Sequence, residues 1–216
     1  MEEVYPRVRL VYPESKFTTG QPFTYLLERP AGNLLLANFS GGVDITPMFD
    51  AIEALGGVSL QLVTDRRAAS EMNNHVFERF GAPVICSEIE AVALRAQGIK
   101  VGDDFAYEEV SIADDLEAFP TPGLTPGGVC YLWHSDMSEY MFVGEIVFPA
   151  GSDAWHTPTD LDNLDDLFES LEVLQEMEFH VMVGSSPQAT EVPVFDLNAG
   201  KRWNIFEKAM EFLEDQ

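Results

Sequence analysis

Short apolar runs separated by polar turns mark the first third of the chain. The runs at 23–28 and 34–39 flank a Pro/Gly/Asn turn at 30–33, a pattern that predicts a β-hairpin. Residues 48–55 then predict a helix. The run at 58–64 carries the apolar residues Val58, Leu60, Leu62 and Val63, and we interpret it as a strand buried on both faces.

The stretch that follows alternates helices with a short strand. Residues 70–80 predict a helix, and residues 83–86 predict a strand. Ser87 followed by Glu90 is a capping-box pattern, which predicts a helix that runs to Ala96. An alternation of strand and helix of this kind indicates βαβ units.

The second half of the chain is richer in predicted strands, at 107–112, 116–119, 129–133, 140–143 and 179–183. Thr159 with Asp162 is a second capping-box pattern. Apolar residues then recur at three- and four-residue steps from Leu161 to Met177, which predicts an amphipathic helix of about four turns.

The last predicted helix begins after Asn198, a suitable N-cap residue. Its apolar face is formed by Trp203, Phe206, Met210 and Leu213. This face could pack internally or against a second copy of the chain, so a homodimer is an open alternative.

Composition changes this picture mainly through charge. The chain has 12 basic and 37 acidic residues, which give a net charge of −25. Such a surface repels nucleic acid and anionic lipid, so neither a nucleic acid nor a membrane is an expected partner. The acids are spread along the chain. They indicate either a solvated surface in a salt-rich cytoplasm or a field that steers a cationic partner.

The chain shows no sign of a membrane or secretory segment. No apolar run approaches the roughly 18 residues of a membrane span, and Met1–Val4 has neither the basic nor the apolar region of a signal peptide. A cytoplasmic location is therefore expected. Cys86 and Cys130 lie in predicted strands, so we expect them to be buried, reduced packing residues.

Two loops carry the most distinctive motifs. Residues 62–70 read Leu-Val-Thr-Asp-Arg-Arg-Ala-Ala-Ser, and residues 121–128 read Thr-Pro-Gly-Leu-Thr-Pro-Gly-Gly. This pairing resembles the metallo-β-lactamase fold superfamily. There a strand ends in Thr-His-x-His-x-Asp-His, and a later loop reads Thr-Pro-Gly-His-Thr-Pro-Gly. The family's Asp-Thr-Gly turn is represented here by residues 38–42, Asn-Phe-Ser-Gly-Gly. The resemblance covers roughly residues 20–186.

The resemblance implies a four-layer αββα sandwich, in which two mixed β-sheets pack together and helices flank them. Each half of the chain would supply one sheet and one layer of helices, which agrees with the predicted order of elements. No Ser/Gly-rich linker divides the chain, so a single domain over 1–216 is expected.

The resemblance also implies where a metal site would lie, and most ligands are replaced. Carried over position by position, the ligand positions hold Asp65, Arg67, Ala69, Ser70, Leu124, Glu145 and Ser185. Only Asp65 and Glu145 still carry groups that bind metal well, whereas a zinc site has three or four protein ligands. We therefore expect no metal cofactor.

Arg67 stands at a histidine position and suggests a specific hypothesis. A guanidinium about 4 Å from a dication repels it by about 8 kcal/mol at an effective dielectric constant near 20. Arg67, with Arg66 beside it, would instead replace the metal charge and pair with Asp65 and Glu145. The alternative is that both arginines point to solvent.

Three functions remain open at this point. The leading one is a non-catalytic pseudo-hydrolase that binds a small molecule or a protein partner at the former active-site edge, formed by Asp65, Arg66, Arg67, Ser70, Leu124, Glu145 and Ser185. The second is a hydrolase that cleaves an ester, thioester or phosphoester with water activated by zinc or another divalent metal. Its rearranged or mononuclear site would be built from Asp65, Glu71, His75 and Glu145. The third is a structural or interaction protein whose old site is filled by side chains.

Overall fold

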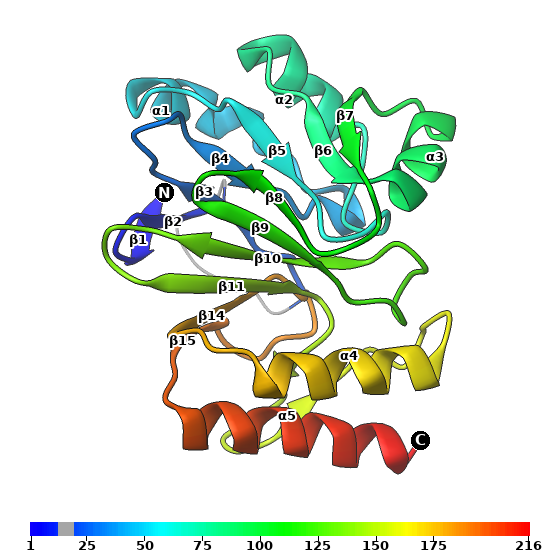
Figure 1. The fold of residues 1–216 in the computed structure, drawn as a ribbon. Coiled ribbons are helices and arrows are strands. Elements are labelled where there is room, and N and C mark those ends of the chain that lie inside the picture. The colour runs from blue at the N-terminus through cyan, green and yellow to red at the C-terminus, as the bar shows by residue number, and fades with distance from the viewer. Residues whose placement is uncertain (13–19) are drawn as a thin grey trace.

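The chain folds into four layers, with helices on the outside and two facing β-sheets between them (Figure 1). The computed structural model describes residues 1–12 and 20–216. The αββα sandwich expected from the sequence motifs is confirmed. No helix of the described part is both long and apolar enough to cross a membrane.

The first sheet has the strand order β1-β2-β3-β4-β5-β6-β7. Its strands are β1 (Glu2–Tyr5), β2 (Val8–Val11), β3 (Thr24–Leu27), β4 (Leu34–Leu36), β5 (Leu60–Leu62), β6 (Val84–Ser87) and β7 (Val101–Phe105). The strands from β4 to β7 pair in parallel, whereas β1 to β4 form antiparallel hairpins. The helices that connect the parallel strands are α1 (Phe49–Ala54), α2 (Met72–Phe80) and α3 (Glu88–Ala96). The predicted βαβ units are therefore confirmed.

The second sheet has the order β15-β14-β11-β10-β9-β8. Its strands are β8 (Val110–Ala113), β9 (Leu116–Pro120), β10 (Val129–His134), β11 (Glu139–Gly144), β14 (Val181–Gly184) and β15 (Val194–Asp196). A separate ribbon pairs β12 (Phe148–Pro149) with β13 (Trp155–His156). Helices α4 (Leu164–Glu176) and α5 (Ala199–Glu214) cover the outer face of this sheet (Figure 1).

Alternating side chains of the central strands reach two different apolar layers. Leu34 and Leu36 of β4 pack between the two sheets, while Leu35 packs under the outer helices of the first sheet. In β10, Tyr131 faces the other sheet and Leu132 faces α4 and α5. Because successive side chains of a strand point to opposite faces, both sheets are buried on both sides. This burial explains the near-continuous apolar runs in the sequence.

Two predicted helix starts change in the structure. The Thr159–Asp162 capping box is wrong, because α4 begins at Leu164 and Asn163 is its N-cap, accepting from the backbone N–H groups of its first turn. Ser87 caps α3 as predicted, and its hydroxyl oxygen accepts from the backbone N–H of Glu90. The Glu90 carboxylate, however, does not close a reciprocal capping box and binds Arg66 instead.

Several strands were not predicted from the sequence. Six of them are β1, β2, β7, β12, β13 and β15. They are short, and β7 carries consecutive acidic residues at Asp103 and Asp104, which obscure a strand pattern. β8 also begins later than expected, so that Tyr107 lies before it.

Candidate functional site

The loops of the two halves meet where β4, β5, β11 and β14 end. The backbone N–H of Val129 donates to the Thr64 carbonyl oxygen over 2.8 Å, and the N–H of Phe23 donates to the Ser185 carbonyl oxygen over 3.1 Å. Both bonds join segments that are far apart in the sequence. The strand ends that carry Asp65, Glu145 and Ser185 therefore meet in one polar region of the interior.

Asn38, directly after β4, is at the centre of this region. Its side-chain N–H donates to Glu145 Oε1 over 2.7 Å and to the Ser185 carbonyl oxygen over 3.0 Å. Its Oδ1 accepts from the Ser40 backbone N–H over 3.1 Å. We did not predict a role for Asn38. The only signal was its place in the turn that corresponds to the family's Asp-Thr-Gly.

Asp65 is 2% exposed and lies in the loop that follows β5, after Val63 and Thr64. One carboxylate oxygen accepts from the Arg67 backbone N–H over 2.8 Å, and the other accepts from the Thr64 hydroxyl over 3.1 Å. Burial raises the pKa of Asp65 above its ordinary value, although these two hydrogen bonds act in the opposite direction. The carboxylate is thus held by its own loop.

Glu145 is 5% exposed and directly follows β11. Burial raises the pKa of its carboxyl group first, and the negative charge of Asp65 raises it further. Hydrogen bonds from Asn38 and, over 3.5 Å, from the Ser40 hydroxyl favour the ionised form. Asp65 and Glu145 therefore act on each other electrostatically.

Gly144 allows the two strand ends to approach each other. Its φ is +60°, and a Cβ at this position would lie 2.5 Å from Thr64 Oγ1. A larger residue would push β11 away from the end of β5. The close approach places Glu145 beside the loop that carries Asp65.

The two arginines do not pair with Asp65 and Glu145 through their side chains, so that hypothesis is corrected. Arg66 forms a bidentate ion pair with Glu90, with distances of 2.7 and 2.9 Å. The Arg67 guanidinium donates to the Asp160 carbonyl oxygen and lies 3.8 Å from its carboxylate. The buried carboxylate of Glu90 thus binds Arg66, and the loop before α4 binds Arg67.

The remaining positions do not fit a metal ion. Leu124 is buried and packs with Leu132 and Leu167 in the apolar layer beneath α4. Ser185 is also buried, and its hydroxyl lies 3.2 Å from the Asn38 amide. The surviving carboxylates already accept internal hydrogen bonds, and the other positions offer no imidazole or thiolate. The donor set at this place is therefore poor for zinc.

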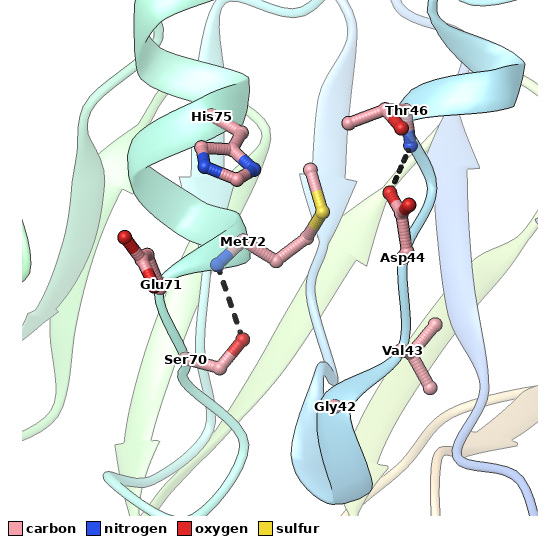
Figure 2. Close-up of a pocket in the computed structure, with 8 residues that line it drawn as sticks. All are labelled: Gly42, Val43, Asp44, Thr46, Ser70, Glu71, Met72 and His75. Carbon is pink, nitrogen blue, oxygen red and sulfur yellow. Dashed lines mark hydrogen bonds between the residues drawn. The ribbon is translucent and has the colours of Figure 1, made fainter.

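The rearranged ligand set of Asp65, Glu71, His75 and Glu145 is not assembled. Glu71 and His75 line an open pocket beside Asp44, whereas Asp65 and Glu145 are interior residues (Figure 2). Within the described parts of the chain, no three His, Cys, Asp or Glu side chains are grouped so that they could hold a metal ion. Glu71 and His75 are four residues apart and were therefore predicted to share one face of a helix. That face points away from Asp65 and Glu145.

Comparisons with known proteins place these observations in context. No protein-family model matches the chain, and no curated protein matches it. Solved structures do match. A metallo-β-lactamase from Pontibacter korlensis is 18% identical, with a TM-score of 0.68 and coverage of 97% of this chain and 100% of that one.

Two further structures are similar over the whole chain. A Cronobacter sakazakii metallo-β-lactamase mutated in its HARLDQ motif is 14% identical, with a TM-score of 0.71 and coverage of 100% of this chain and 95% of that one. A B3 metallo-β-lactamase described as having an active-site glutamic acid is 16% identical, with a TM-score of 0.68 and coverage of 99% and 88%. At these identities the likeness concerns the fold and not the reaction.

Proposed function

The chain has the metallo-β-lactamase fold, and from that premise we propose that it is a non-catalytic member that binds a small molecule or a protein partner at the former active-site edge. The observation that most directly supports this proposal is the hydrogen-bond cluster of Asn38, Glu145 and Ser185. It uses the side chains of this edge to hold the two halves together. They are therefore poorly placed to bind a catalytic ion.

The chemistry of the surviving donors supports this proposal. Both oxygens of Asp65 accept hydrogen bonds from their own loop, and one oxygen of Glu145 accepts from Asn38. A metal would have to replace these bonds and would gain no ligand from Leu124. The cost of breaking buried hydrogen bonds to charged groups is about 1.5–3 kcal/mol each.

The rim of this edge is the part that a partner can reach. The side chains of Arg66 and Arg67 are 30% and 33% exposed, and Ser70 is partly exposed beside the open pocket. Arg67 donates to the Asp160 carbonyl oxygen and lies 3.8 Å from the solvated Asp160 carboxylate. A binding role at the rim is thus compatible with a closed interior.

A structural role is the second candidate, because of the burial of Leu124, Glu145 and Ser185. These three side chains would be buried in the same way if they only filled the site and bound no partner. The two candidates differ in whether the rim residues matter. Exchange of Arg67 and Ser70 for alanine should abolish binding of a partner under the first, and should leave every interaction of the protein unchanged under the second.

Metal content tests the non-catalytic proposal directly. The purified protein is loaded with zinc or manganese, desalted and analysed for its elements, and its thermal unfolding is followed with zinc and with a chelator. We expect no stoichiometric metal and no change in Tm. Asp65→Asn should give the same result as Glu207→Gln, an exposed control on α5. A stoichiometric metal that Asp65→Asn removes would overturn the proposal in favour of a metal-dependent hydrolase.

A further inference from the structure

Among the described residues, four strands form the edges of the two large sheets. β1 and β7 end the first sheet, and β15 and β8 end the second. β1 contains two glutamates, β7 contains two aspartates and β15 contains one aspartate, whereas β8 contains no charged residue. Charged side chains on an edge strand oppose its pairing with another chain. β8 is therefore the edge strand least protected against the addition of a further strand.

The outer side of β8 is accessible. β8 lies at the end of the second sheet (Figure 1) and pairs antiparallel with β9, with Val110 opposite Ala118 and Ser111 opposite Glu117. No other strand of the described chain pairs with it. Ser111 is exposed, and the other three residues of β8 are partly exposed. Because N–H and C=O groups alternate between the two sides of a strand, β8 presents part of its backbone to an incoming chain.

The turn after β8 fixes the position of this edge. The Asp115 carboxylate accepts from Arg29 Nε over 2.9 Å and from Trp133 Nε1 over 3.1 Å. The carbonyl oxygen of Asp115 accepts from the His134 backbone N–H over 2.9 Å. On the other side of the turn, Val110 and Ile112 pack against the apolar layer between the sheets. A preformed edge of this kind loses little conformational freedom when a peptide binds to it.

Exposed carboxylates lie at both ends of this uncharged strand. Glu109 directly precedes β8, Asp114 directly follows it, and both are exposed. Antiparallel pairing of β8 with a second copy would place Glu109 of one copy opposite Asp114 of the other. Like charges directly opposite each other are destabilising. A strand with a basic residue at each end would instead place a cation opposite each carboxylate.

We propose that β8 is the docking site of an extended peptide segment of a partner protein, with a lysine or arginine at each end of an uncharged stretch of four residues. The segment adds to the six-stranded sheet beside β8. Backbone hydrogen bonds hold the segment, and the flanking charges select it. The inference does not depend on the proposed function, because β8 is none of the strands whose ends form the former active-site edge.

Three labelled hexapeptides, blocked at both termini, test the inference by fluorescence anisotropy. The sequences are Lys-Thr-Val-Thr-Val-Lys, Lys-Thr-Pro-Thr-Pro-Lys and Glu-Thr-Val-Thr-Val-Glu. The second has the charge of the first but lacks two N–H donors, and the third has the opposite charge. All titrations use an ionic strength of about 0.15 M, so that screening is equal. We expect saturable binding of the first peptide, binding at least about tenfold weaker of the second, and none of the third.

A matched pair of variants tests the flanking charge. Glu109→Lys reverses one charge beside β8, and Glu207→Lys reverses one exposed charge on α5, so both change the net charge equally. Glu109→Lys should weaken binding of the first peptide at least about fivefold, because an attractive pair becomes a repulsive one. Glu207→Lys should leave it unchanged. Circular dichroism confirms that both variants are folded.

Amide hydrogen exchange locates the bound peptide on the wild-type protein. Strand addition covers backbone groups of β8, so the first peptide should slow exchange in residues 110–113. Exchange in α5 should not change. The same measurement without peptide, over a range of protein concentrations, tests for pairing of β8 with a second copy.

Five results would overturn the inference. The first peptide would show no saturable binding, or the proline peptide would bind as tightly, which excludes strand addition. Equal weakening by Glu109→Lys and Glu207→Lys would mean attraction by the overall charge. Slowed exchange only outside β8 would place the peptide elsewhere. Slowed exchange in β8 with rising protein concentration would assign the edge to a second copy of the chain.

Discussion

The side-chain amide of Asn38 donates to the Glu145 carboxylate over 2.7 Å, and the same amide donates to the Ser185 carbonyl oxygen over 3.0 Å. Asn38, which follows β4 of the first sheet, thus holds two loops of the second sheet by itself. The amide N–H groups thus favour the ionised form of Glu145, as does the more distant charge of Arg67.

The first prediction concerns this amide. Asn38→Ala leaves the buried Glu145 carboxylate without its closest donor, so the free energy of unfolding should fall by about 1–3 kcal/mol. Asn204→Ala, at an exposed position of α5, should change it by less than about 0.5 kcal/mol. Urea unfolding measures both. Equal effects of the two variants would mean that the amide does not hold the loops together.

The second prediction concerns pH. The pKa of Glu145 is raised above its ordinary value of 4.5, chiefly by burial. Because the folded state holds this proton more tightly, the contribution of Glu145 to stability is fully present below pH 4.5 and is lost as the pH rises through the folded-state pKa. Glu145→Gln keeps an acceptor for Asn38 and cannot ionise. This variant should therefore gain stability relative to the wild type as the pH rises from 4.5 to 8.

Unfolding by urea at several pH values checks this difference between the variant and the wild type. The difference removes the effect of acidic residues remote from Glu145, which titrate alike in both proteins, and retains the effect of Asp65, whose charge acts on Glu145. Glu207→Gln, exposed on α5, provides the control and should follow the wild-type curve. A Glu145→Gln variant that loses stability steadily with rising pH would contradict the raised pKa.

The third prediction concerns the Arg66–Glu90 pair. The fully buried Glu90 accepts from the Arg66 guanidinium and backbone, from the Thr125 hydroxyl and from the Gly127 backbone N–H. Arg66→Ala leaves this carboxylate without its cation, which should cost about 3–5 kcal/mol. Glu78→Ala, at an exposed helical position, should cost far less. Unfolding is measured in urea and not in guanidinium chloride, because guanidinium chloride is a salt.

The fourth prediction concerns two glycines with similar backbone angles. Gly144 has a φ of +60° and Gly41 a φ of +69°, but only at Gly144 would a Cβ meet a neighbour, Thr64 Oγ1 at 2.5 Å. Gly41→Ala should cost about 1 kcal/mol for the left-handed backbone alone. Gly144→Ala adds a steric clash and should cost at least about 1 kcal/mol more, because the two strand ends must separate. Thermal unfolding of both variants measures the difference, and equal Tm values would contradict the close approach of β5 and β11.

Apolar periodicity predicted most of the strands and helices of the sandwich. Residues 61–64 of the run at 58–64 are buried, and α3 begins after Ser87 as expected. The boundaries were weaker where local signals competed. Thr159 and Asp162 match the capping-box pattern in sequence, but Asn163 caps α4 in the structure. The reason is that the loop before α4 contacts Arg67 and Gly123. Such contacts are not visible in a local window.

Sequence motifs singled out residues that lie close together in the structure, but not the hydrogen bonds that those residues form. The motifs located Asp65, Leu124, Glu145 and Ser185, and the structure places Asp65, Glu145 and Ser185 at the adjoining strand ends while Leu124 enters the core. The pairing of Arg67 with Asp65 and Glu145 was wrong. A guanidinium binds the carboxylates or carbonyls that surround it, and those come from distant segments. Glu90 was expected to complete a capping box, and its binding to Arg66 instead could not be read from its neighbours in the sequence.

The sequence by itself indicated the order of strands and helices through its apolar periodicity, and its motifs indicated a layered fold with replaced metal ligands through their resemblance to the metallo-β-lactamase fold superfamily, because periodicity and residue identity are local properties. Leu124 cannot bind a metal in any conformation. Only the tertiary structure decided which groups replace the ligands. Asn38, Glu145 and Ser185 come from different segments, and a hydrogen bond depends on distance and direction that arise when both sheets pack together. The same packing turns Glu71 and His75 away from the interior and into the pocket beside Asp44.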